Sequence, residues 1–326
     1  MKSRPLGKTG ARVSALGFGC MGLVGWYGER DDAEAAATLR AAIDAGCTHL
    51  DTAASYQVGE NEKFVGATIR GRRDEVFLAS KCGIAWRDGK LEIDNKPESI
   101  IASCEASLAR LGTDRLDLFY LHRIDRSVPI EESVGALARL VKAGKIRHAG
   151  LSECSAATLR RACAVHPIAA VQCEYSVWWR EPEQELLPAC RELGVGFVAY
   201  SPLGRGFLAG NFRTLDDLPQ NDARRNQPRF TPENIAHNAR IADAVRALAA
   251  RKSATAAQIA LAWVLAQGED ILPIPGTKRR SRLTENVGSL EVKLSAAEMS
   301  ELVREVDRIA VHGERYPAAM LQALGG

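Results

Sequence analysis

The sequence predicts an α/β fold in which a single closed (β/α)8 barrel, of the TIM type, spans residues 1–326. Short β-branched or apolar segments alternate with longer amphipathic segments along the 326-residue chain. This alternation is typical of strands and helices around a parallel sheet. The repeat recurs about every 30 residues, the length of one strand-helix unit. Because the composition does not change along the chain, the even spacing favours one barrel over two domains.

Eight strand segments, each followed by a helix, account for this pattern. The predicted strands cover residues 13–19, 49–53, 76–82, 116–122, 146–152, 169–175, 196–201 and 271–275. The predicted helices cover residues 33–45, 60–70, 97–111, 130–143, 156–165, 183–193, 234–251 and 256–267. Asp32 and Thr255 are expected to cap the N-termini of two helices. Glycines of the kind that end helices stand at the expected places: Gly46, Gly112, Gly144 and Gly194.

Two segments lie outside this repeat. The long loop 202–231 follows the seventh strand and is rich in Gly, Asn, Asp, Pro and Arg. Loops of this length inside a compact fold are usually functional or disordered. The eighth strand is followed by a predicted helix over 296–309 and by a C-terminal tail that contains Arg315, Tyr316 and Pro317. Two interpretations of the tail stay open: a terminus packed on the surface, and a lid over the site.

Composition and charge exclude several classes of protein. The chain is 46% hydrophobic and 25% charged, which excludes a disordered or collagen-like chain. The formal net charge of +3 is too small to indicate a nucleic acid or a membrane as the partner. The eight cysteines and six histidines lack the spacing of a metal site, so no metal is expected. With no CxxC motif, no apolar leader and no apolar stretch of about 18 residues, we expect a reduced, cytoplasmic protein.

Polar residues gather at the ends of the predicted strands. Asp51 ends the second strand with Tyr56 in the loop after it, Lys81 ends the third, and His122 ends the fourth. Since the site of such a barrel lies at the carboxyl ends of its strands, we expect these side chains to meet. Each alone has an ordinary structural explanation, and their agreement across strands is what points to function. The next strands end in a further polar set: Ser152, Glu153, Gln172, Glu174, Tyr175, Tyr200 and Ser201.

Asp51, Tyr56, Lys81 and His122 form a coherent group for proton transfer. A free phenol has a pKa of about 10, too high for easy donation at neutral pH. An ammonium group on Lys81 is expected to lower the pKa of Tyr56, and Asp51 to keep Lys81 charged and oriented. His122 can donate a hydrogen bond to a substrate carbonyl oxygen. No Ser or Cys has a His base at motif spacing, so the group favours carbonyl reduction with hydride from a bound cofactor.

A glycine-rich segment resembles a dinucleotide fingerprint only in form. Residues 17–22 fit the pattern G-x-G-x-x-G, but the helical pattern begins only near Asp32. A Rossmann fingerprint must open a helix directly after the strand. We therefore interpret this segment as a loop that lets the backbone approach a ligand closely.

A series of motifs runs along nearly the whole chain, from Leu6 to about Leu290. They are Leu50-Asp51-Thr52-Ala53 with Tyr56, Ser80-Lys81, Tyr120-Leu121-His122, Gly150-Leu151-Ser152, Val171-Gln172-Cys173-Glu174-Tyr175-Ser176, Tyr200-Ser201-Pro202-Leu203-Gly204-Arg205-Gly206 and Ile274-Pro275-Gly276-Thr277-Lys278. With these motifs in this order, the chain resembles the aldo-keto reductases. Its pattern looks closest to the bacterial and plant branch that also resembles potassium-channel β subunits. Glu153 departs from the family pattern, in which Asn is common, and Gly276-Thr277 replaces Lys-Ser.

This resemblance implies a barrel that binds NADPH in an extended form, with NADPH favoured over NADH. It implies Tyr56 as the general acid/base, Lys81 and Asp51 as its tuning partners, and His122 as the donor to the carbonyl. It also implies a set of cofactor contacts. Gly19, Met21, Ser152, Gln172 and Tyr200 would surround the nicotinamide, Ser201, Leu203 and Arg205 the pyrophosphate, Lys278 and Arg282 the 2′-phosphate, and Glu285 and Asn286 the adenine. Gly276 would be a further contact of the cofactor.

The basic cluster 278–282 allows other interpretations from its residues alone. A solvated helix start and a nucleic-acid contact both fit a short run of charge. Loops after the last two strands of a barrel often bind phosphate, however, and Lys or Arg suits a phosphate group. We therefore expect the 2′-phosphate of NADP here.

Aromatic residues in predicted loops are candidates for a substrate pocket: Trp26 with Tyr27 beside it, Trp86 and Trp178. Simple loop packing explains them equally well. No fixed charge is evident to anchor a carboxylate, so we expect aromatic or medium-sized apolar aldehydes, with ketones as a further option. Two other functions stay open: a redox-sensing subunit that binds NADP(H) with little turnover, and a Schiff-base lyase that uses Lys81. The sequence identifies neither the physiological substrate nor the oligomeric state.

Overall fold

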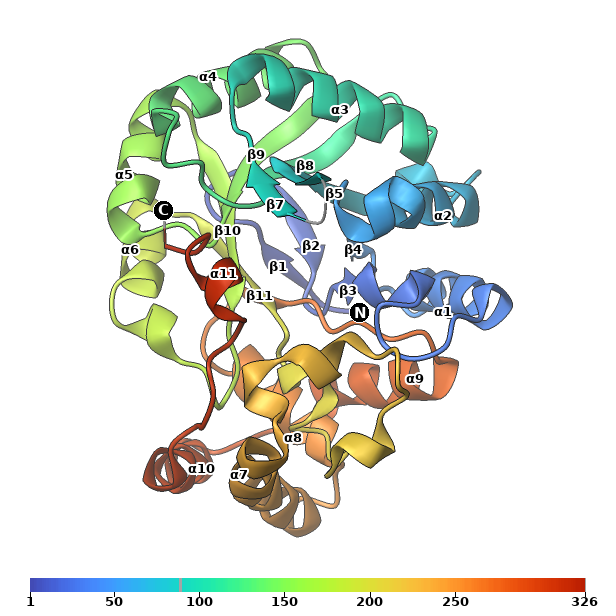
Figure 1. Ribbon diagram of the computed structural model, residues 1–326, viewed down its shortest axis with the longest axis vertical. Coiled ribbons are helices and arrows are strands. Elements are labelled where there is room, and N and C mark those ends of the chain that lie inside the picture. The colour runs from blue at the N-terminus through green and yellow to red at the C-terminus, as the bar shows by residue number, and fades with distance from the viewer. Residues whose placement is uncertain (88–89, 326) are drawn as a thin grey trace.

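Eight parallel strands form one sheet that curls into a barrel (Figure 1). The structure is a computed structural model that describes residues 1–87 and 90–325, without the side chains of Trp86, Arg87 and Lys90. Main-chain bonds from Gly17 to Pro273 and from Gly19 to Pro275, of 2.9 and 3.2 Å, join the first and last strands. In spatial order the strands are β3 (Phe18–Gly19), β4 (His49–Asp51), β5 (Phe77–Cys82), β8 (Leu116–Leu121), β9 (Ile146–Ser152), β10 (Ile168–Glu174), β11 (Gly196–Tyr200) and β12 (Ile271–Pro273).

Helices surround this sheet, as expected for the (β/α)8 fold (Figure 1). Thr255 caps α8 in a capping box with Gln258, as predicted. The predicted cap at Asp32 is wrong, because the Asp31 side chain accepts the hydrogen bond from the Glu34 amide. The helices are α1 (Asp32–Asp44), α2 (Glu60–Thr68), α3 (Pro97–Leu111), α4 (Ile130–Lys142), α5 (Ala156–Val165), α6 (Leu186–Leu193), α7 (Pro232–Arg251), α8 (Ala256–Leu265), α9 (Arg280–Gly288), α10 (Ala296–Ile309) and α11 (Ala318–Leu321).

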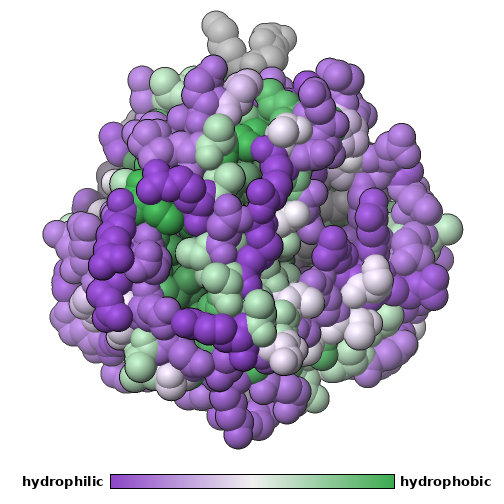
Figure 2. Space-filling view, turned by 90° about the horizontal axis from the view of Figure 1, so that it is seen from below, coloured by the Kyte–Doolittle hydropathy of each residue, from purple (hydrophilic) through white to green (hydrophobic). Residues whose placement is uncertain are grey.

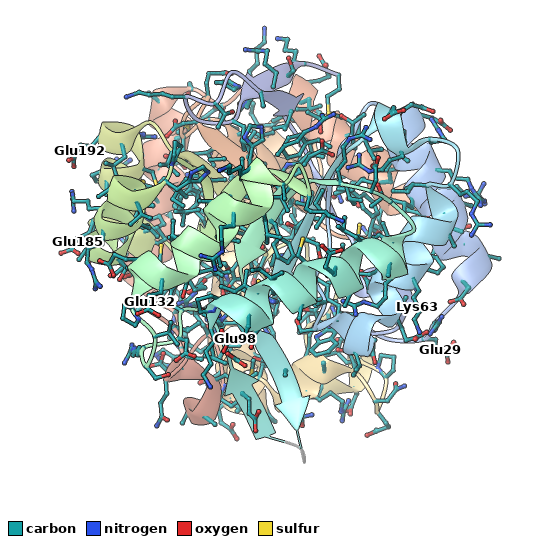
Figure 3. The ribbon with its side chains drawn as sticks, turned by 90° about the horizontal axis from the view of Figure 1, so that it is seen from above. Glu29, Lys63, Glu98, Glu132, Glu185 and Glu192 are labelled. Carbon is teal, nitrogen blue, oxygen red and sulfur yellow. The ribbon has the colours of Figure 1, made fainter. Side chains whose placement is uncertain are left out.

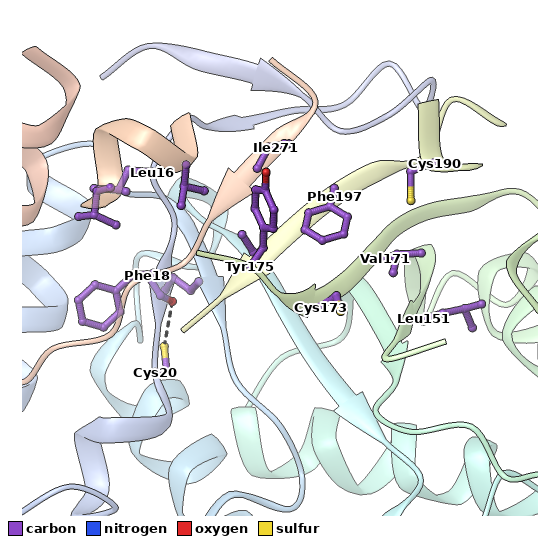
Figure 4. Close-up of a cluster of buried hydrophobic side chains, with 14 of the residues drawn as sticks. Leu16, Phe18, Cys20, Leu151, Val171, Cys173, Tyr175, Cys190, Phe197 and Ile271 are labelled. Atoms are coloured by element: carbon purple, nitrogen blue, oxygen red, sulfur yellow. Dashed lines mark hydrogen bonds between the residues drawn. The ribbon is translucent and has the colours of Figure 1, made fainter. Parts of the chain in front are cut away.

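Alternation along the strands divides the apolar core into two layers. In β8, Leu118 and Tyr120 point into the barrel, whereas Phe119 and Leu121 pack outward against the helices. The outer layer is the larger of the two, and Figure 4 shows part of it around Tyr175 and Phe197. This packing fixes the strand ends, so it also fixes the positions of the polar residues there.

Two hairpins interrupt the predicted repeat. The expected strand 13–19 is wrong as a single element, because only Phe18–Gly19 joins the barrel. Its first part instead forms an antiparallel hairpin of β1 (Ser3–Pro5) and β2 (Arg12–Ser14). Leu6 and Val13 of this hairpin segment pack into the interior core. A second hairpin, β6 (Ile84–Arg87) with β7 (Lys90–Ile93), follows β5.

The outside of the molecule is mainly hydrophilic. Hydrophilic side chains cover most of the face seen in Figure 2, and the apolar ones lie in smaller groups between them. Charged residues such as Glu132, Glu185 and Glu192 project outward from the helical layer (Figure 3). Among the residues that the structure describes, no helix combines the length and the apolar character needed to cross a membrane.

Candidate active site

A cavity of about 860 Å³ opens at the carboxyl ends of the barrel strands. Strand ends contribute Asp51, His122, Gln172 and Tyr200 to its wall. The long loop 202–231 and the C-terminal tail complete the wall, so both cover the site rather than the outer surface. In Figure 1 the tail, in red, runs from α10 across the barrel to α11. The tail residues in the wall are Tyr316, Pro317, Met320 and Ala323.

Lys81 is the centre of a buried polar group at the base of this cavity. Its ammonium donates to the Asp51 Oδ1 at 2.5 Å, to the Thr52 main-chain oxygen at 2.8 Å and to the Tyr56 hydroxyl at 3.3 Å. Burial lowers the pKa of Lys81, but Asp51 and Tyr56 outweigh burial and leave that pKa raised. A fully buried, charged amine with these partners is a poor nucleophile, which argues against a Schiff base on Lys81.

Tyr56 lines the cavity above Lys81, and its pKa differs from the expectation. Burial raises the pKa of the phenol, and this effect outweighs the opposite effect of Lys81. The expected lowering of the Tyr56 pKa is therefore wrong in sign for the protein alone, because the sequence does not show how deeply the phenol is buried. The hydroxyl is a proton donor in its neutral form, held by the ammonium at 3.3 Å.

His122 lies beside Tyr56, with ring centroids 5.8 Å apart in an edge-to-face arrangement. Burial holds the pKa of His122 well below its usual range, with further lowering by Arg123 and Lys81, so the imidazole is neutral. Its Nδ1 lies 3.2 Å from the Ser55 hydroxyl. In the tautomer in which Ser55 donates this bond, Nε2 carries the proton and can donate to a substrate oxygen.

Gln172 and Ser152 continue the wall away from this group. Gln172 donates to the second Asp51 oxygen at 2.7 Å, so Asp51 is bound on both of its oxygens. The buried Ser152 hydroxyl has no hydrogen-bond partner among the described residues. An orphaned hydroxyl in a cavity wall fits a ligand with an amide group, such as the carboxamide of nicotinamide.

The residues predicted for the cofactor all lie along the same cavity. Gly19, Met21, Ser152, Gln172, Tyr200, Ser201, Leu203, Arg205, Gly276, Lys278, Arg282, Glu285 and Asn286 line it. Arg205, Arg279 and Arg282 bring positive charge to the side that the pyrophosphate and 2′-phosphate would occupy. These donors, together with the Ser152 hydroxyl, fit NADP(H), and those residues would hold it.

Two of the expected phosphate ligands have other partners. Lys278 donates through its ammonium to the main-chain oxygens of Tyr27 and Glu29, the first at 2.7 Å. It thereby ties the loop after β3 to the loop after β12. Arg282 pairs with Glu285 at 2.7 Å and remains partly exposed. Arg282 is thus the more available of the two for a 2′-phosphate.

The C-terminal tail is fastened to the barrel by a buried ion pair. Arg315 donates to both oxygens of Glu153, at 3.0 and 2.9 Å. The Tyr200 hydroxyl donates to the same carboxylate at 2.7 Å and lies 2.9 Å from the Tyr316 hydroxyl. Burial raises the pKa of Glu153, but Arg315 outweighs it and lowers that pKa to about 2. Glu153, which departs from the family pattern, therefore binds the tail through both of its carboxylate oxygens.

Glu153 also belongs to a group of residues with strained backbones. Its φ is 55°, and two further cavity residues, Ser201 and Arg205, have φ values of 50° and 59°. Non-glycine residues rarely adopt this left-handed conformation, which costs about 1–2 kcal/mol. Strain of this kind gathers at functional sites, where packing holds it in place.

The aromatic residues predicted for the substrate divide into three cases. Trp26 and Tyr27 line the cavity. Trp178 does not, and the structure corrects this expectation: it is 4% exposed and stacks on Phe207 and Phe230 at ring distances of 5.4 and 6.4 Å. Trp178 is buried in the core because it packs against these apolar residues of the long loop. The side chain of Trp86 lies outside the described part of the structure.

The sequence analysis did not single out Ser55, Arg123 and Arg224 as site residues, and it left open whether the tail with Arg315 and Tyr316 covers the site. Arg123 had a usable signal, because it follows His122 at the same strand end. The pairing of Arg315 with Glu153 had no such signal, since the two residues lie 162 positions apart in the chain. Among the described residues, no group of three or more His, Cys, Asp or Glu side chains could hold a metal ion.

Comparisons with known proteins agree with this geometry. The family model "Aldo/keto reductase family" matches residues 15–307. A curated NADP(+) aldo-keto reductase from Schizosaccharomyces pombe is 47% identical over 312 residues, which cover 94% of this chain and 92% of that protein.

Solved structures show the same relationship. A glycerol dehydrogenase from Gluconobacter oxydans has a TM-score of 0.85 at 27% identity, covering 94% of this chain and 95% of that one. A thermostable aldo-keto reductase solved with the inhibitor epalrestat has a TM-score of 0.76 at 32% identity, covering 94% and 100%. The holo form of an aldo-keto reductase from Bacillus halodurans has a TM-score of 0.76 at 27% identity, covering 97% and 99%. With a matching family model over most of its length and a relative at 47% identity, this chain belongs to the aldo/keto reductase family.

Proposed function

We propose that this aldo-keto reductase reduces aldehydes, and also ketones, to alcohols with NADPH as the reductant. The observation that carries the proposal is the Tyr56 hydroxyl, which lines the cavity 3.3 Å from a buried ammonium. The NADP(+) dependence of the relative from Schizosaccharomyces pombe supports the choice of nucleotide. The orphaned Ser152 hydroxyl and the arginines along the cavity support it independently.

Two side chains of the site have different roles at the carbonyl group of the substrate. NADPH held by the cavity residues described above would supply the hydride, and with it two electrons, for the carbonyl carbon. His122 donates a hydrogen bond to the carbonyl oxygen and so stabilises the negative charge that develops there. Tyr56 transfers its hydroxyl proton to that oxygen, which completes the alcohol.

Lys81 and Asp51 act through Tyr56. The ammonium stabilises the phenolate that remains after proton transfer, because it is fully buried and lies at hydrogen-bond distance from the phenol. Asp51 holds the ammonium in place and keeps it charged. Solvent then returns a proton to Tyr56. The overall reaction consumes one NADPH, one proton and one carbonyl group.

The test is the substitution Tyr56→Phe. The variant is expected to bind NADPH as tightly as the wild type but to lose aldehyde reduction by about 10²–10⁴-fold, the usual contribution of a positioned acid. Binding is measured by fluorescence titration, and turnover by loss of the near-ultraviolet absorbance of NADPH.

Tyr175→Phe is a matched control. It also removes a buried hydroxyl, one that bonds Glu183 and lies in the core away from the cavity. This control is expected to keep its turnover. Full turnover in Tyr56→Phe would disprove the assignment of the proton donor, and a wild type that oxidises no NADPH with any aldehyde would disprove the reaction.

A further inference from the structure

Arg123 is a buried cation in the cavity wall that the reaction described above does not use. It follows His122 directly after β8, is only 7% exposed and lines the cavity. One nitrogen of the guanidinium donates to the main-chain oxygen of His122 at 2.6 Å. Within the described part of the chain, no carboxylate lies at ion-pair distance from it. Its remaining donors therefore have no protein acceptor to satisfy them.

Four buried carboxylates near the cavity each have a cation at hydrogen-bond distance. The charge of Glu153 reaches Arg123, but both oxygens of this carboxylate are already bound by Arg315. Among the described cations that line the cavity, Arg123 and Arg205 have no carboxylate at ion-pair distance. Lys278 and Arg279 also lack one, but they belong to the loop after β12, where Lys278 is bound to main-chain oxygens. The matched pairs are Lys81 with Asp51 at 2.5 Å, Arg315 with Glu153 at 2.9 Å, Arg229 with Glu174 at 2.8 Å and Arg224 with Asp222 at 2.8 Å.

These two arginines come from different strand ends, although both guanidinium groups lie beside the ring of Tyr316, at 6.0 and 4.7 Å. Arg205 belongs to the loop after β11, on the side assigned to the pyrophosphate. Arg123 stands at the strand end that also carries His122, and its charge reaches the phenol of Tyr56. A guanidinium out of water is costly unless an anion accompanies it. Because Arg123 directly follows His122, its position points to an anion that comes with the molecule that is reduced.

We propose that Arg123 is the anchor for a carboxylate of the substrate, so that the preferred substrates are oxo acids: aldehydes or ketones that also carry a carboxylate. The proposal rests on the proposed carbonyl reduction and names its substrate class. It replaces the apolar aldehydes expected from the sequence. The planar guanidinium presents paired donors that match a carboxylate.

The surroundings of Arg123 suit this role. The ring of Tyr316 lies 6.0 Å from the guanidinium and comes from the tail that Arg315 holds in place. With Tyr56 and His122 on the reacting carbonyl, Arg123 fixes a second point of the substrate and so orients the carbonyl for reduction.

The experiment compares the three carboxybenzaldehyde isomers with their methyl esters, each assayed with NADPH in the full-length enzyme. The isomers place the carboxylate at different distances from the carbonyl, and the esters remove only the charge. In the wild type, kcat/KM is expected to favour at least one acid over its ester. In Arg123→Met this ratio of acid to ester should fall by about 10- to 100-fold, the usual effect of one charge-assisted bond.

Two further variants make the result specific. Arg123→Lys keeps the charge but loses the paired donors, so it should retain part of the preference and also serves if the Met variant fails to fold. Arg139→Met removes an exposed arginine of α4 and should leave the ratio unchanged. A wild type that favours no acid over its ester would overturn the proposal. So would an Arg123→Met variant whose pH profile shifts while its ratio stays constant, because Arg123 would then only tune Tyr56.

A binding measurement separates this proposal from the proposed reaction. In Tyr56→Phe, which is expected not to turn over, the favoured carboxybenzyl alcohol is titrated into the complex with NADP+ by calorimetry. The same titration is repeated after Arg123→Met is added to the Tyr56→Phe variant. Loss of alcohol binding in this double variant would support the anchor even if aldehyde reduction itself is disproved. Equal binding of the acid and its ester would disprove the anchor even if reduction is established.

Discussion

The guanidinium of Arg315 spans both oxygens of the Glu153 carboxylate, although the two residues lie 162 positions apart in the chain. Both side chains are buried, with exposed fractions of 8% and 3%. The pair joins the C-terminal tail to the end of β9, and the neighbouring Tyr316 and Tyr200 close the cavity above it. The tail is therefore a fixed part of the cavity wall.

We expect Arg315→Met to destabilise the protein by about 3 kcal/mol, because it leaves the Glu153 carboxylate buried without its cation. The substitution keeps an apolar stem against Trp179, which the guanidinium now covers at 4.7 Å. Chemical denaturation measures the loss. The double variant Glu153→Gln with Arg315→Met should cost much less than the sum of the single variants. Costs that simply add would show that the two groups do not interact.

The same pair makes stability depend on acid. The folded-state pKa of Glu153 is about 2, below its unfolded value, because Arg315 outweighs the effect of burial. A group with a lowered pKa stabilises the fold above the unfolded pKa, and this contribution of about 3 kcal/mol is lost as pH falls from about 4.5 to 2.

Glu153→Gln should therefore lose stability at pH 6 but show a shallower decline below pH 4.5 than the wild type. Denaturation measured across this range checks both expectations. The exposed Glu98→Gln is the control, and its decline should run parallel to that of the wild type. A decline in Glu153→Gln as steep as in the wild type would contradict the assigned role of the pair.

Local periodicity was enough to predict the barrel, its helices and the meeting of polar strand ends, because each depends on residues close together in sequence. The bounds 296–309 of α10 were predicted without error. The two hairpins were not, since strands of three or four residues are too short to show an alternating pattern. The ion pair of Arg315 and the burial of Trp178 depend on distant segments. The direction of the Tyr56 pKa depends on burial, which no local pattern reveals.

The raised pKa of Tyr56 predicts how reduction depends on pH. Reduction needs the protonated phenol, so its rate should fall only as pH rises through that pKa. Because burial outweighs Lys81 and places this pKa above its ordinary value of about 10, kcat/KM should stay constant through pH 9. Steady-state rates with NADPH and a neutral aldehyde measure the profile. A fall in kcat/KM between pH 7 and 8 would instead support a phenol acidified by Lys81.

Lys278 and Arg282 should differ in their effect on the nucleotide. Arg282→Ala is expected to weaken the binding of NADPH by about 10- to 100-fold and the binding of NADH only a little, because only NADPH carries the 2′-phosphate. Lys278→Ala should weaken the binding of both nucleotides by a similar factor. Lys278 holds the loop after β3 in place through the main-chain oxygens of Tyr27 and Glu29, and both nucleotides depend on that loop. Fluorescence titration of each variant with each nucleotide gives four dissociation constants, and each is compared with that of the wild type. Equal losses of NADPH and NADH in Arg282→Ala would exclude its contact with the 2′-phosphate.

A substitution at Val58, close to the proposed proton donor Tyr56, is expected to raise the stability of the protein. Val58 follows Tyr56 by two positions, adopts φ 51° and ψ 44°, and is 83% exposed. A β-branched residue is strained in this left-handed conformation, whereas Asn tolerates it, so Val58→Asn should stabilise the fold by about 1 kcal/mol. The melting temperature should rise by about 2 °C, with aldehyde reduction unchanged. Val165→Asn, at an exposed valine that ends α5, should bring no such gain. A lower melting temperature in Val58→Asn would mean that the valine side chain, and not the backbone conformation, sets the stability of this turn.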